Sequence, residues 1–205
     1  MMQEVEVTLE QMLLAREDRA AKQRRLLETF SLPLISFTVN IPGPWKSTST
    51  SRQIFQEGYQ SLIHRLTMNR ISPVYLETYN LATGSEAFIV VDADERAVKE
   101  LVISLENLHP LGRLLDMDVI GRNGTIVSRE DLSHPKRKCL LCEQDAHVCG
   151  RSRAHSITEL LHAIQKIADD YFQKEAPHAR TPEFVCQLLM KKEGKSNGSS
   201  ISSNR

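Results

Sequence analysis

A strict alternation of apolar and polar residues over residues 35–41 constrains the fold of this chain more than any other feature. Isoleucine, phenylalanine and valine alternate there with serine, threonine and asparagine. Because side chains two positions apart on a strand share one face, this pattern predicts a strand with one face on a core. The periodicity is helical on both sides of it, from Thr8 to Phe30 and from about Arg52 to Met68. The chain therefore combines helices with a sheet.

The middle of the chain continues this alternation without a βαβ repeat. Two strand-like runs, 74–81 and 87–91, flank Thr83-Gly84, which is typical of a hairpin turn. Asp94 can cap a third helix, and the apolar run 114–120 is strand-like. Since no repeat requires a parallel sheet, we predict an α+β fold: a single mixed-sheet domain packed by helices.

The C-terminal part contains one turn, one loop and one helix start. Asn123-Gly124 predicts a turn, with a short return strand at 125–127. Residues 134–155 are expected to form a Cys-rich loop. Ser156-Ile-Thr-Glu159 is a capping box that opens a helix to about Phe172.

The length of 205 residues suits one well-buried domain. We assign residues 1–175 to this main domain. Residues 176–192 are predicted to form a short C-terminal helix, which begins near Thr181. Residues 193–205 are rich in Ser, Asn, Lys and Gly and are predicted to be a disordered tail.

Charge and composition exclude some classes of protein. Lys and Arg number 26, as do Asp and Glu, so no strong overall field favours a nucleic-acid coat or a membrane surface. No run approaches the ~20 apolar residues of a membrane span, and the acidic N-terminus lacks the pattern of a secretory signal. We expect a soluble, cytoplasmic protein. Its four cysteines, three of them clustered, indicate a metal site or free thiols rather than disulfides.

Two aspartates, Asp116 and Asp118, interrupt the apolar run 114–120. On a strand they point to the same face, where like charges need a counter-charge. Mg²⁺ prefers carboxylates together with phosphate oxygens, so the pair predicts phosphoryl or nucleotidyl transfer. Arg113 could grip phosphate at two points if it lies in the turn before the strand. The alternative is a strand whose aspartates face water, with Arg113 paired to one of them.

A second candidate phosphate contact lies after the strand at 35–41. Lys46-Ser47 follows Pro42-Gly43-Pro44, but the loop lacks the glycines of a Walker A motif, which excludes that assignment. Lys46 can still contact phosphate as a point charge. The alternative is a solvated surface lysine.

Cys139, Cys142, Cys149 and His155 have a spacing that could form a tetrahedral, structural zinc site. Basic residues surround them and favour thiolates; these are Lys136, Arg137, Lys138, Arg151 and Arg153. The alternative is three reduced thiols in a loop whose basic residues bind an anion. This loop also supports a second functional hypothesis, a non-catalytic zinc-knuckle module that binds a carrier protein or nucleic acid. Cys186, on the predicted last helix, is expected to be structural.

Five stretches resemble one known family, in one order along roughly residues 8–170. They read REDRAAKQRRLL (16–27), PLISFTVNIPGPWKST (33–48), TGSEAFIVVDA (83–93), HPLGRLLDMDV (109–119) and RKCLLCEQDAHVCGRSRAHS (137–156). Together they are similar to the apo-citrate lyase phosphoribosyl-dephospho-CoA transferases, also called citrate lyase holo-acyl-carrier-protein synthases.

The resemblance implies a nucleotidyltransferase-type reaction. A 2'-(5''-triphosphoribosyl)-3'-dephospho-CoA donor would be transferred to a serine of the apo acyl carrier protein, the γ subunit of citrate lyase, with release of pyrophosphate. The partners would be that carrier and that donor, with no membrane and no nucleic acid. The implied fold could be nucleotidyltransferase-like. However, Asn107-Leu-His-Pro and Gly112-Arg113 stand where enzymes of the DNA-polymerase-β type usually have a Gly-Ser pair.

The resemblance also implies roles for the candidate residues. Asp116 and Asp118 would bind Mg²⁺, and one of them could orient or deprotonate the serine hydroxyl. Arg113 and Lys46 would hold the triphosphate. The basic loop, with Arg137, Arg151 and Arg153, would hold the rest of the donor or the acidic carrier protein.

Overall fold

The computed structural model describes residues 4–175. The helices and strands follow in the order α1 (Leu9–Phe30), β1 (Leu34–Val39), α2 (Ser49–Met68), β2 (Pro73–Leu81), β3 (Gly84–Val91), α3 (Glu95–Leu108), β4 (Leu115–Ile120), α4 (Ala146–Ser152) and α5 (Ile157–Glu175). Two 3₁₀ turns, η1 (Gly112–Leu114) and η2 (Glu130–Leu132), complete them. By compactness the chain divides after Tyr171, and of the second unit only the last turn of α5 is described. The predicted helix at 176–192, with Cys186, and the predicted tail at 193–205 lie outside the described residues.

The four strands form one sheet in the order β2-β3-β1-β4. β2 and β3 are joined by the predicted hairpin, whose turn needs the positive φ of 114° at Gly84. The α3 crossover brings β4 back parallel to β3, but β1 lies between them. Each pair of adjacent strands in this sheet is antiparallel. The α+β class is confirmed, whereas the expectation of a mixed sheet is corrected in this respect.

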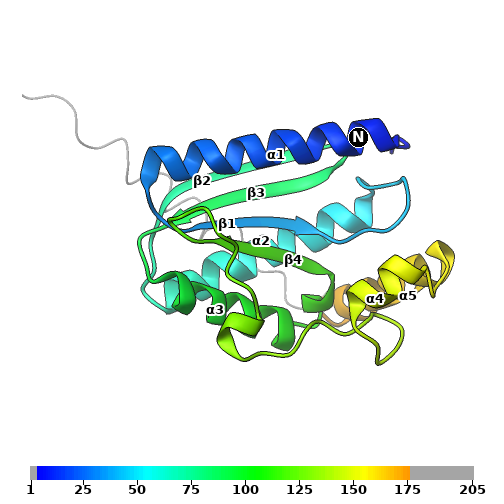
Figure 1. Ribbon diagram of the computed structural model, residues 1–205. Helices are drawn as coiled ribbons and strands as arrows, with labels where there is room; N and C mark the ends of the chain where they lie inside the picture. The colour runs from blue at the N-terminus through cyan, green and yellow to red at the C-terminus, as the bar shows by residue number, and fades with distance from the viewer. Residues whose placement is uncertain (1–3, 176–205) are drawn as a thin grey trace, which may run out of the picture. The chain divides into compact units, whose positions relative to one another are not determined.

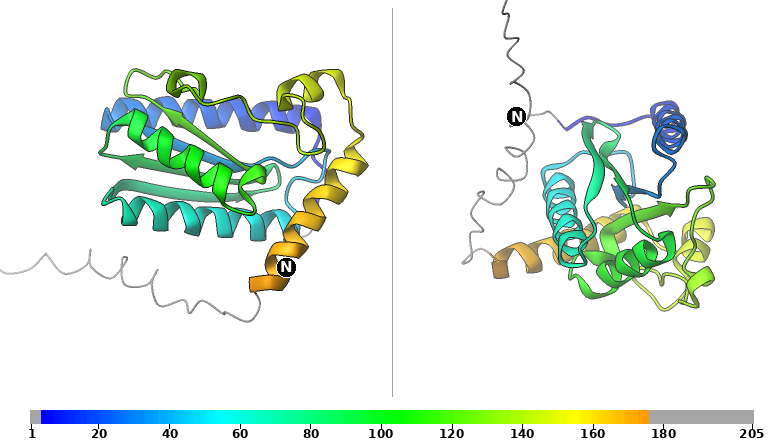
Figure 2. Two further views of the ribbon diagram at one scale, coloured as in Figure 1. Left: turned by 90° about the horizontal axis from the view of Figure 1, so that it is seen from below. Right: turned by 90° about the vertical axis from the view of Figure 1, so that its left-hand side faces the viewer.

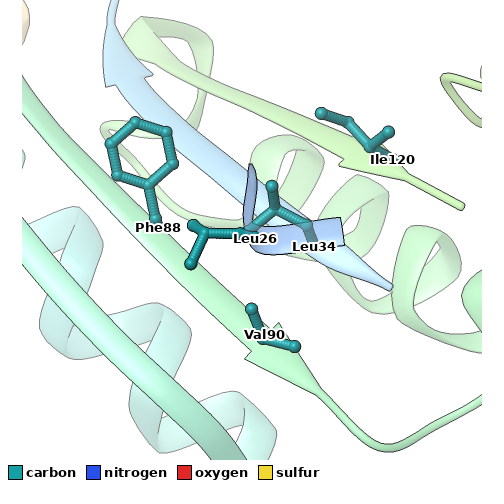
Figure 3. Packing of buried hydrophobic residues seen from close by; sticks show 5 residues of the cluster. All are labelled: Leu26, Leu34, Phe88, Val90 and Ile120. Atoms are coloured by element: carbon teal, nitrogen blue, oxygen red, sulfur yellow. The ribbon is translucent and has the colours of Figure 1, made fainter. Parts of the chain in front are cut away.

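The sheet is covered on both faces by helices. α1 lies on one face, and α2 and α3 lie on the other (Figures 1 and 2). Beneath α1, five buried side chains form an apolar cluster (Figure 3), namely Leu26, Leu34, Phe88, Val90 and Ile120. On the opposite face Phe37 stacks on Phe55 of α2, with ring centroids 4.9 Å apart. Burying each such side chain contributes ~1.5–3 kcal/mol to stability.

Two helix starts predicted from capping residues are confirmed. Asp94 accepts hydrogen bonds from the first turn of α3, and Ser156 and Glu159 form the reciprocal bonds of a capping box before α5. α1 begins after Thr8, which caps it in a box with Gln11. The apolar stripe of α1 is less buried than its periodicity indicates, because Leu9 and Leu13 are exposed. The N-terminal half of α1 is held to the sheet in part by a polar contact, between Arg19 and Glu86 of β3.

Two local predictions are wrong. Residues 125–127 form no return strand; the Asn123-Gly124 turn is present, but a single bridge joins Ile120 to Ile126. The ladder stops there because side chains occupy the rest of the free edge of β4. Residues 134–155 are not wholly a loop, since α4 begins after Asp145 and buries Cys149 on its inner side.

Among residues 4–175, every helix is too short or too polar to cross a bilayer.

Candidate functional site

Asp116 and Asp118 lie on the α1-covered face of β4. Their partners across the ladder are Thr38 and Ser36 of β1, so all four side chains point to this face. The residues between and around them on β4 are buried, whereas Asp118 is exposed and the side chain of Asp116 is 48% exposed. The two carboxylates thus share a face that solvent can reach, at the polar end of the sheet.

The two carboxylates influence each other electrostatically. Desolvation by the surrounding protein, followed by the negative charge of Asp116, raises the pKa of Asp118. The positive charges of Lys99, Arg137 and Arg19 oppose this rise. Part of the rise in the pKa of Asp118 is thus repulsion between the two carboxylates, which a bound divalent cation would relieve.

Helix α1 brings further polar groups to the same face. Arg19 donates to the buried carboxylate of Glu86 from both Nε (3.0 Å) and Nη2 (2.5 Å). Gln23 donates to the Ser36 hydroxyl at 2.9 Å. These bonds hold the polar half of α1 over the sheet and place a guanidinium near Asp118.

Lys46 lies in the loop after β1, close to the N-terminal half of α1. Its ammonium group donates to the carbonyl of Ile41, which ties the loop together. Burial, followed by the positive charge of Arg16, lowers the pKa of Lys46. Arg16 itself is exposed and has no ion-pair partner within the described chain. Lys46 is thus partly buried beside a second cation rather than a freely solvated surface lysine.

The free edge of β4 is closed by buried charged side chains. Glu106 of α3, whose side chain is 1% exposed, accepts from the Met117 N–H at 3.3 Å and from Arg129 at 2.5 Å. Arg137 donates to the same carboxylate and to the carbonyl of Leu115 at 3.0 Å. An edge strand with unpaired backbone groups would otherwise pair with another chain.

Arg137 reaches beyond this edge to the aspartate pair. Its Nη1 atom lies 3.4 Å from Oδ1 of Asp116. Arg137 is thus committed to Glu106, the backbone of β4 and Asp116. Arg137 therefore helps to position Asp116 and is also part of the surface of the site.

Arg113 lies in η1, in the turn immediately before β4, as its predicted role requires. Desolvation and the positive charges of Arg137 and Arg129 lower its pKa, although a guanidinium stays charged. No hydrogen bond or ion pair joins it to another of residues 4–175. The alternative in which Arg113 pairs with Asp116 or Asp118 is therefore wrong.

Cys139, Cys142, Cys149 and His155 converge on one point. Their ligand atoms all lie within 4.8 Å of one another. Cys142 Sγ is 3.5 Å from Cys149 Sγ and 3.3 Å from His155 Nε2. A zinc tetrahedron with Zn–S of ~2.3 Å and Zn–N of ~2.0–2.1 Å has ligand separations of about 3.5–3.8 Å.

The four side chains fit a metal such as zinc in chemistry as well as in distance. Desolvation and the neighbouring thiols raise the pKa of Cys149 to about 12. Desolvation also acts to raise the pKa of Cys139, but backbone N–H groups of Leu141 and Cys142 lower it to about 7. Three thiolates together need a divalent cation, which deprotonates coordinating thiols.

The basic residues of the Cys-rich segment do not all lie at one place. Arg137, Lys138 and Arg153 line a cavity together with Arg113. Arg151 is exposed on α4 and is not part of that lining. Sequence reasoning, which treated the loop as one basic region, did not distinguish these positions.

One hydroxyl lies beside a histidine, but the pair is not an activated nucleophile. Ser61 Oγ is 3.2 Å from His109 Nε2. Since Nδ1 of His109 accepts from the Leu111 N–H at 3.1 Å, the ring proton lies on Nε2, which faces Ser61 and the carboxylate of Glu57, and the Ser61 hydroxyl donates to that same carboxylate at 3.3 Å. The ring therefore cannot take the proton of this serine.

Sequence reasoning missed four contributors to the site. Glu86 and Glu106 sit inside apolar-rich elements, and Arg16 and Arg19 lie within an ordinary charged helix face. A buried carboxylate requires a partner, so Glu86 within the run of β3 was the one available signal. They are brought to the site by pairing between elements that are distant in sequence.

Comparison with known proteins gives one consistent result. The family described as apo-citrate lyase phosphoribosyl-dephospho-CoA transferase matches residues 7–171. A protein of Vibrio cholerae serotype O1 (strain Classical Ogawa 395), named a probable apo-citrate lyase phosphoribosyl-dephospho-CoA transferase, is 40% identical over 169 residues, covering 82% of this chain and 95% of its own length. A protein of Escherichia coli O1:K1, named an apo-citrate lyase phosphoribosyl-dephospho-CoA transferase, is 39% identical over 164 residues, covering 80% of this chain and 90% of its own length.

Proposed function

The chain belongs to the apo-citrate lyase phosphoribosyl-dephospho-CoA transferase family, and we propose that it attaches a triphosphoribosyl-dephospho-CoA donor to a serine of the apo acyl carrier protein of citrate lyase. The observation that carries this proposal is the aspartate pair: Asp116 and Asp118 share one accessible face of β4. The product would be the holo carrier protein, with pyrophosphate released.

The reaction is a displacement at the α-phosphorus of the donor. The serine oxygen of the carrier forms a bond to this phosphorus while the bond to the pyrophosphate oxygen breaks, and the serine proton is lost. The attacking hydroxyl comes from the partner, so the enzyme needs no nucleophile of its own. Asp116 or Asp118 would orient this hydroxyl or accept its proton.

Asp116 and Asp118 are the residues that would hold Mg²⁺. The like-charge repulsion between them supports this assignment. When bound, the metal neutralises negative charge on the phosphate oxygens. Glu106 and Arg137 would keep Asp116 in position, since Arg137 contacts the carboxylates of Glu106 and Asp116.

Three cations would hold the triphosphate. Lys46 lies beside Arg16 of α1, in the loop after β1, and Arg113 lies in the turn before β4. Arg113 and Arg16 are not neutralised by ion pairs within the described chain, so each can bind phosphate at two points. Arg151, exposed on α4, is available to the acidic carrier protein.

The Cys₃His cluster would hold a structural zinc ion. Its four ligands leave no open position, which is typical of structural rather than catalytic zinc. The zinc-knuckle module without catalysis is not favoured, because the family match covers residues 7–171 and not the loop alone.

The test is a mass measurement on the acceptor. Apo acyl carrier protein is incubated with the enzyme, the donor and Mg²⁺, and intact-protein mass spectrometry follows the reaction. We expect one added phosphoribosyl-dephospho-CoA group per carrier, with one pyrophosphate released. The matched acceptor is a carrier whose modified serine is replaced by alanine. An unchanged mass of the wild-type carrier, under conditions where a known family member modifies it, would overturn the proposal.

A further inference from the structure

A cavity of about 730 Å³ opens beside the aspartate pair, between the start of β4, the Cys-rich segment and the N-terminal half of α5. We call it the knuckle cavity. Six of its lining residues define its chemistry: Arg113, Lys138, Arg153, Leu140, Leu160 and Ile164. Its volume lies within the roughly 300–1,000 Å³ that small-molecule sites occupy.

The lining combines two kinds of surface. Arg113, Lys138 and Arg153 bring positive charge, and none of the described residues that line the cavity is acidic. Lys138 also pairs with Asp145 behind the lining, at 3.6 Å, but this exposed pair leaves its ammonium group accessible. Leu140, Leu160 and Ile164 bring an apolar surface. This combination suits a ligand with a planar or apolar part and an anionic part, as in an adenine nucleotide.

The cavity adjoins the aspartate pair without containing it. Asp116 and Asp118 are not among the lining residues, but Arg137 lines the cavity and contacts Asp116 at 3.4 Å. A donor whose triphosphate lies at the aspartates must extend its remaining part to one side of them. The knuckle cavity is a neighbouring space whose charged lining residues have the required sign. A second cavity, under α1, is lined by carboxylates as well as cations, namely Asp18 and Glu86.

We propose that the knuckle cavity binds the dephospho-CoA part of the donor, with its diphosphate at Lys138 and Arg153 and its adenine against the apolar lining, while Arg113 faces the triphosphate. This proposal rests on the proposed function for the identity of the donor. It gives the Cys₃His cluster a second consequence, because Cys139, Cys149 and His155 are part of the cavity wall. A metal that fixes these side chains would then also shape the nucleotide site.

The experiment compares two ligands that differ only in the part assigned to the cavity. Isothermal titration calorimetry measures Kd for the full donor and for ribose 5-triphosphate, which lacks the dephospho-CoA part. Three variants alter the cavity. Leu160→Trp fills it, Lys138→Gln removes a cation, and Arg153→Asn removes another while suiting the left-handed conformation at this position (φ 51°).

Matched controls carry the same kinds of change outside the cavity. His162→Trp places an indole on the exposed side of α5, and Lys166→Gln removes an exposed lysine of the same helix. Circular dichroism and thermal unfolding establish that each variant is folded. Lys138→Gln is a surface change and keeps the test decisive if Leu160→Trp does not fold.

We expect each cavity variant to weaken donor binding at least tenfold, to leave ribose 5-triphosphate binding within twofold of wild type, and to differ from its control in this respect. The proposal is overturned if the wild type binds both ligands equally, or if the preference for the donor is unchanged in the folded cavity variants. The carrier-modification assay separates the two proposals. If the wild type modifies the carrier but the cavity variants keep the wild-type preference for the donor over ribose 5-triphosphate, only the cavity assignment is refuted. If the cavity variants lose this preference but the wild type does not modify the carrier, only the proposed reaction is refuted.

Discussion

The Nη1 atom of Arg137 lies 3.4 Å from Oδ1 of Asp116, although the two residues are 21 positions apart. Arg137 starts the segment that carries the cysteine cluster, and Asp116 belongs to the proposed magnesium pair. This contact therefore connects the two parts of the molecule that sequence motifs singled out. The same guanidinium is held by the buried carboxylate of Glu106.

The aspartate pair should be essential for transfer but not for folding. Asp118→Asn removes a metal ligand and also removes the repulsion from Asp116. We expect carrier modification to fall at least about a hundredfold, because a bound metal supplies several kcal/mol in such reactions. Thermal unfolding should show a Tm equal to or above that of the wild type. Modification at the wild-type rate with Mg²⁺ present would exclude the metal role of Asp118.

Glu106 should be important for both stability and positioning. Glu106→Gln leaves two guanidinium groups without their buried counter-charge, which costs about 3–5 kcal/mol when a buried pair is broken. Denaturant unfolding measures this loss. The matched control is Glu100→Gln on the same helix, where the carboxylate is 50% exposed and pairs with His134. Equal stability of the two variants would contradict the supporting role of Glu106.

The positioning effect of Glu106 has its own readout. In the fraction of Glu106→Gln that is folded, we expect the Mg²⁺ concentration for half-maximal rate to rise, because Arg137 no longer holds Asp116 in place. A variant that is merely less stable would keep the wild-type Mg²⁺ dependence.

Zinc should bind at one ion per chain and should stabilise the fold. Cys142→Ser removes a ligand whose Sγ lies 3.5 Å from Cys149 Sγ and 3.3 Å from His155 Nε2. We expect loss of the metal by elemental analysis and a lower Tm in the apo form, while the wild type loses both on treatment with a chelator. Cys186→Ser is the control and should retain one zinc. Zinc-free wild-type protein of unchanged Tm would argue against a structural metal.

The pair between Lys22 of α1 and Glu77 of β2 should make stability depend on pH in the acid range. Desolvation acts to raise the pKa of Glu77, but hydrogen bonds from Lys22, Tyr75 and Tyr79 outweigh it and lower this pKa to about 2. A lowered carboxyl pKa stabilises the fold above the unfolded value of 4.5, and this contribution is lost as pH falls towards 2.

Glu77→Gln isolates this contribution. We expect the wild type to be more stable than the variant at neutral pH, by a small amount because both side chains are partly exposed. The difference should shrink between pH 4.5 and 2. Urea unfolding at several pH values measures it, and a difference independent of pH would show that the pair is not an ionic contribution to stability.

Local sequence patterns predicted most elements of this fold, because hydropathy period and capping residues act over a few positions. The alternation at 35–41 became β1, Asp94 capped α3, and Ser156 with Glu159 opened α5. Local sequence could not show that the predicted return strand at 125–127 does not form. Its ladder is limited by Glu106 and Arg137, which come from elsewhere in the chain.

In the candidate site, too, some features follow from local sequence and others only from the tertiary structure. Asp116 and Asp118 share a face because strand geometry has a period of two, and the four zinc ligands are close in sequence. Only the tertiary structure decided that Arg19, Glu86 and Glu106 surround these aspartates, since each lies on a different element.

What the sequence determined by itself was the family, the order of helices and strands, and the residues with the right chemistry. What only the tertiary structure decided was which charges meet. Arg113 forms no ion pair within residues 4–175, Arg137 is bound to Glu106 and Asp116, and Arg151 is not part of the cavity lining. All three are arginines of the motifs that the sequence singled out. The reason is physical: backbone periodicity is local, whereas the partner of a buried charge is set by strand order and helix packing.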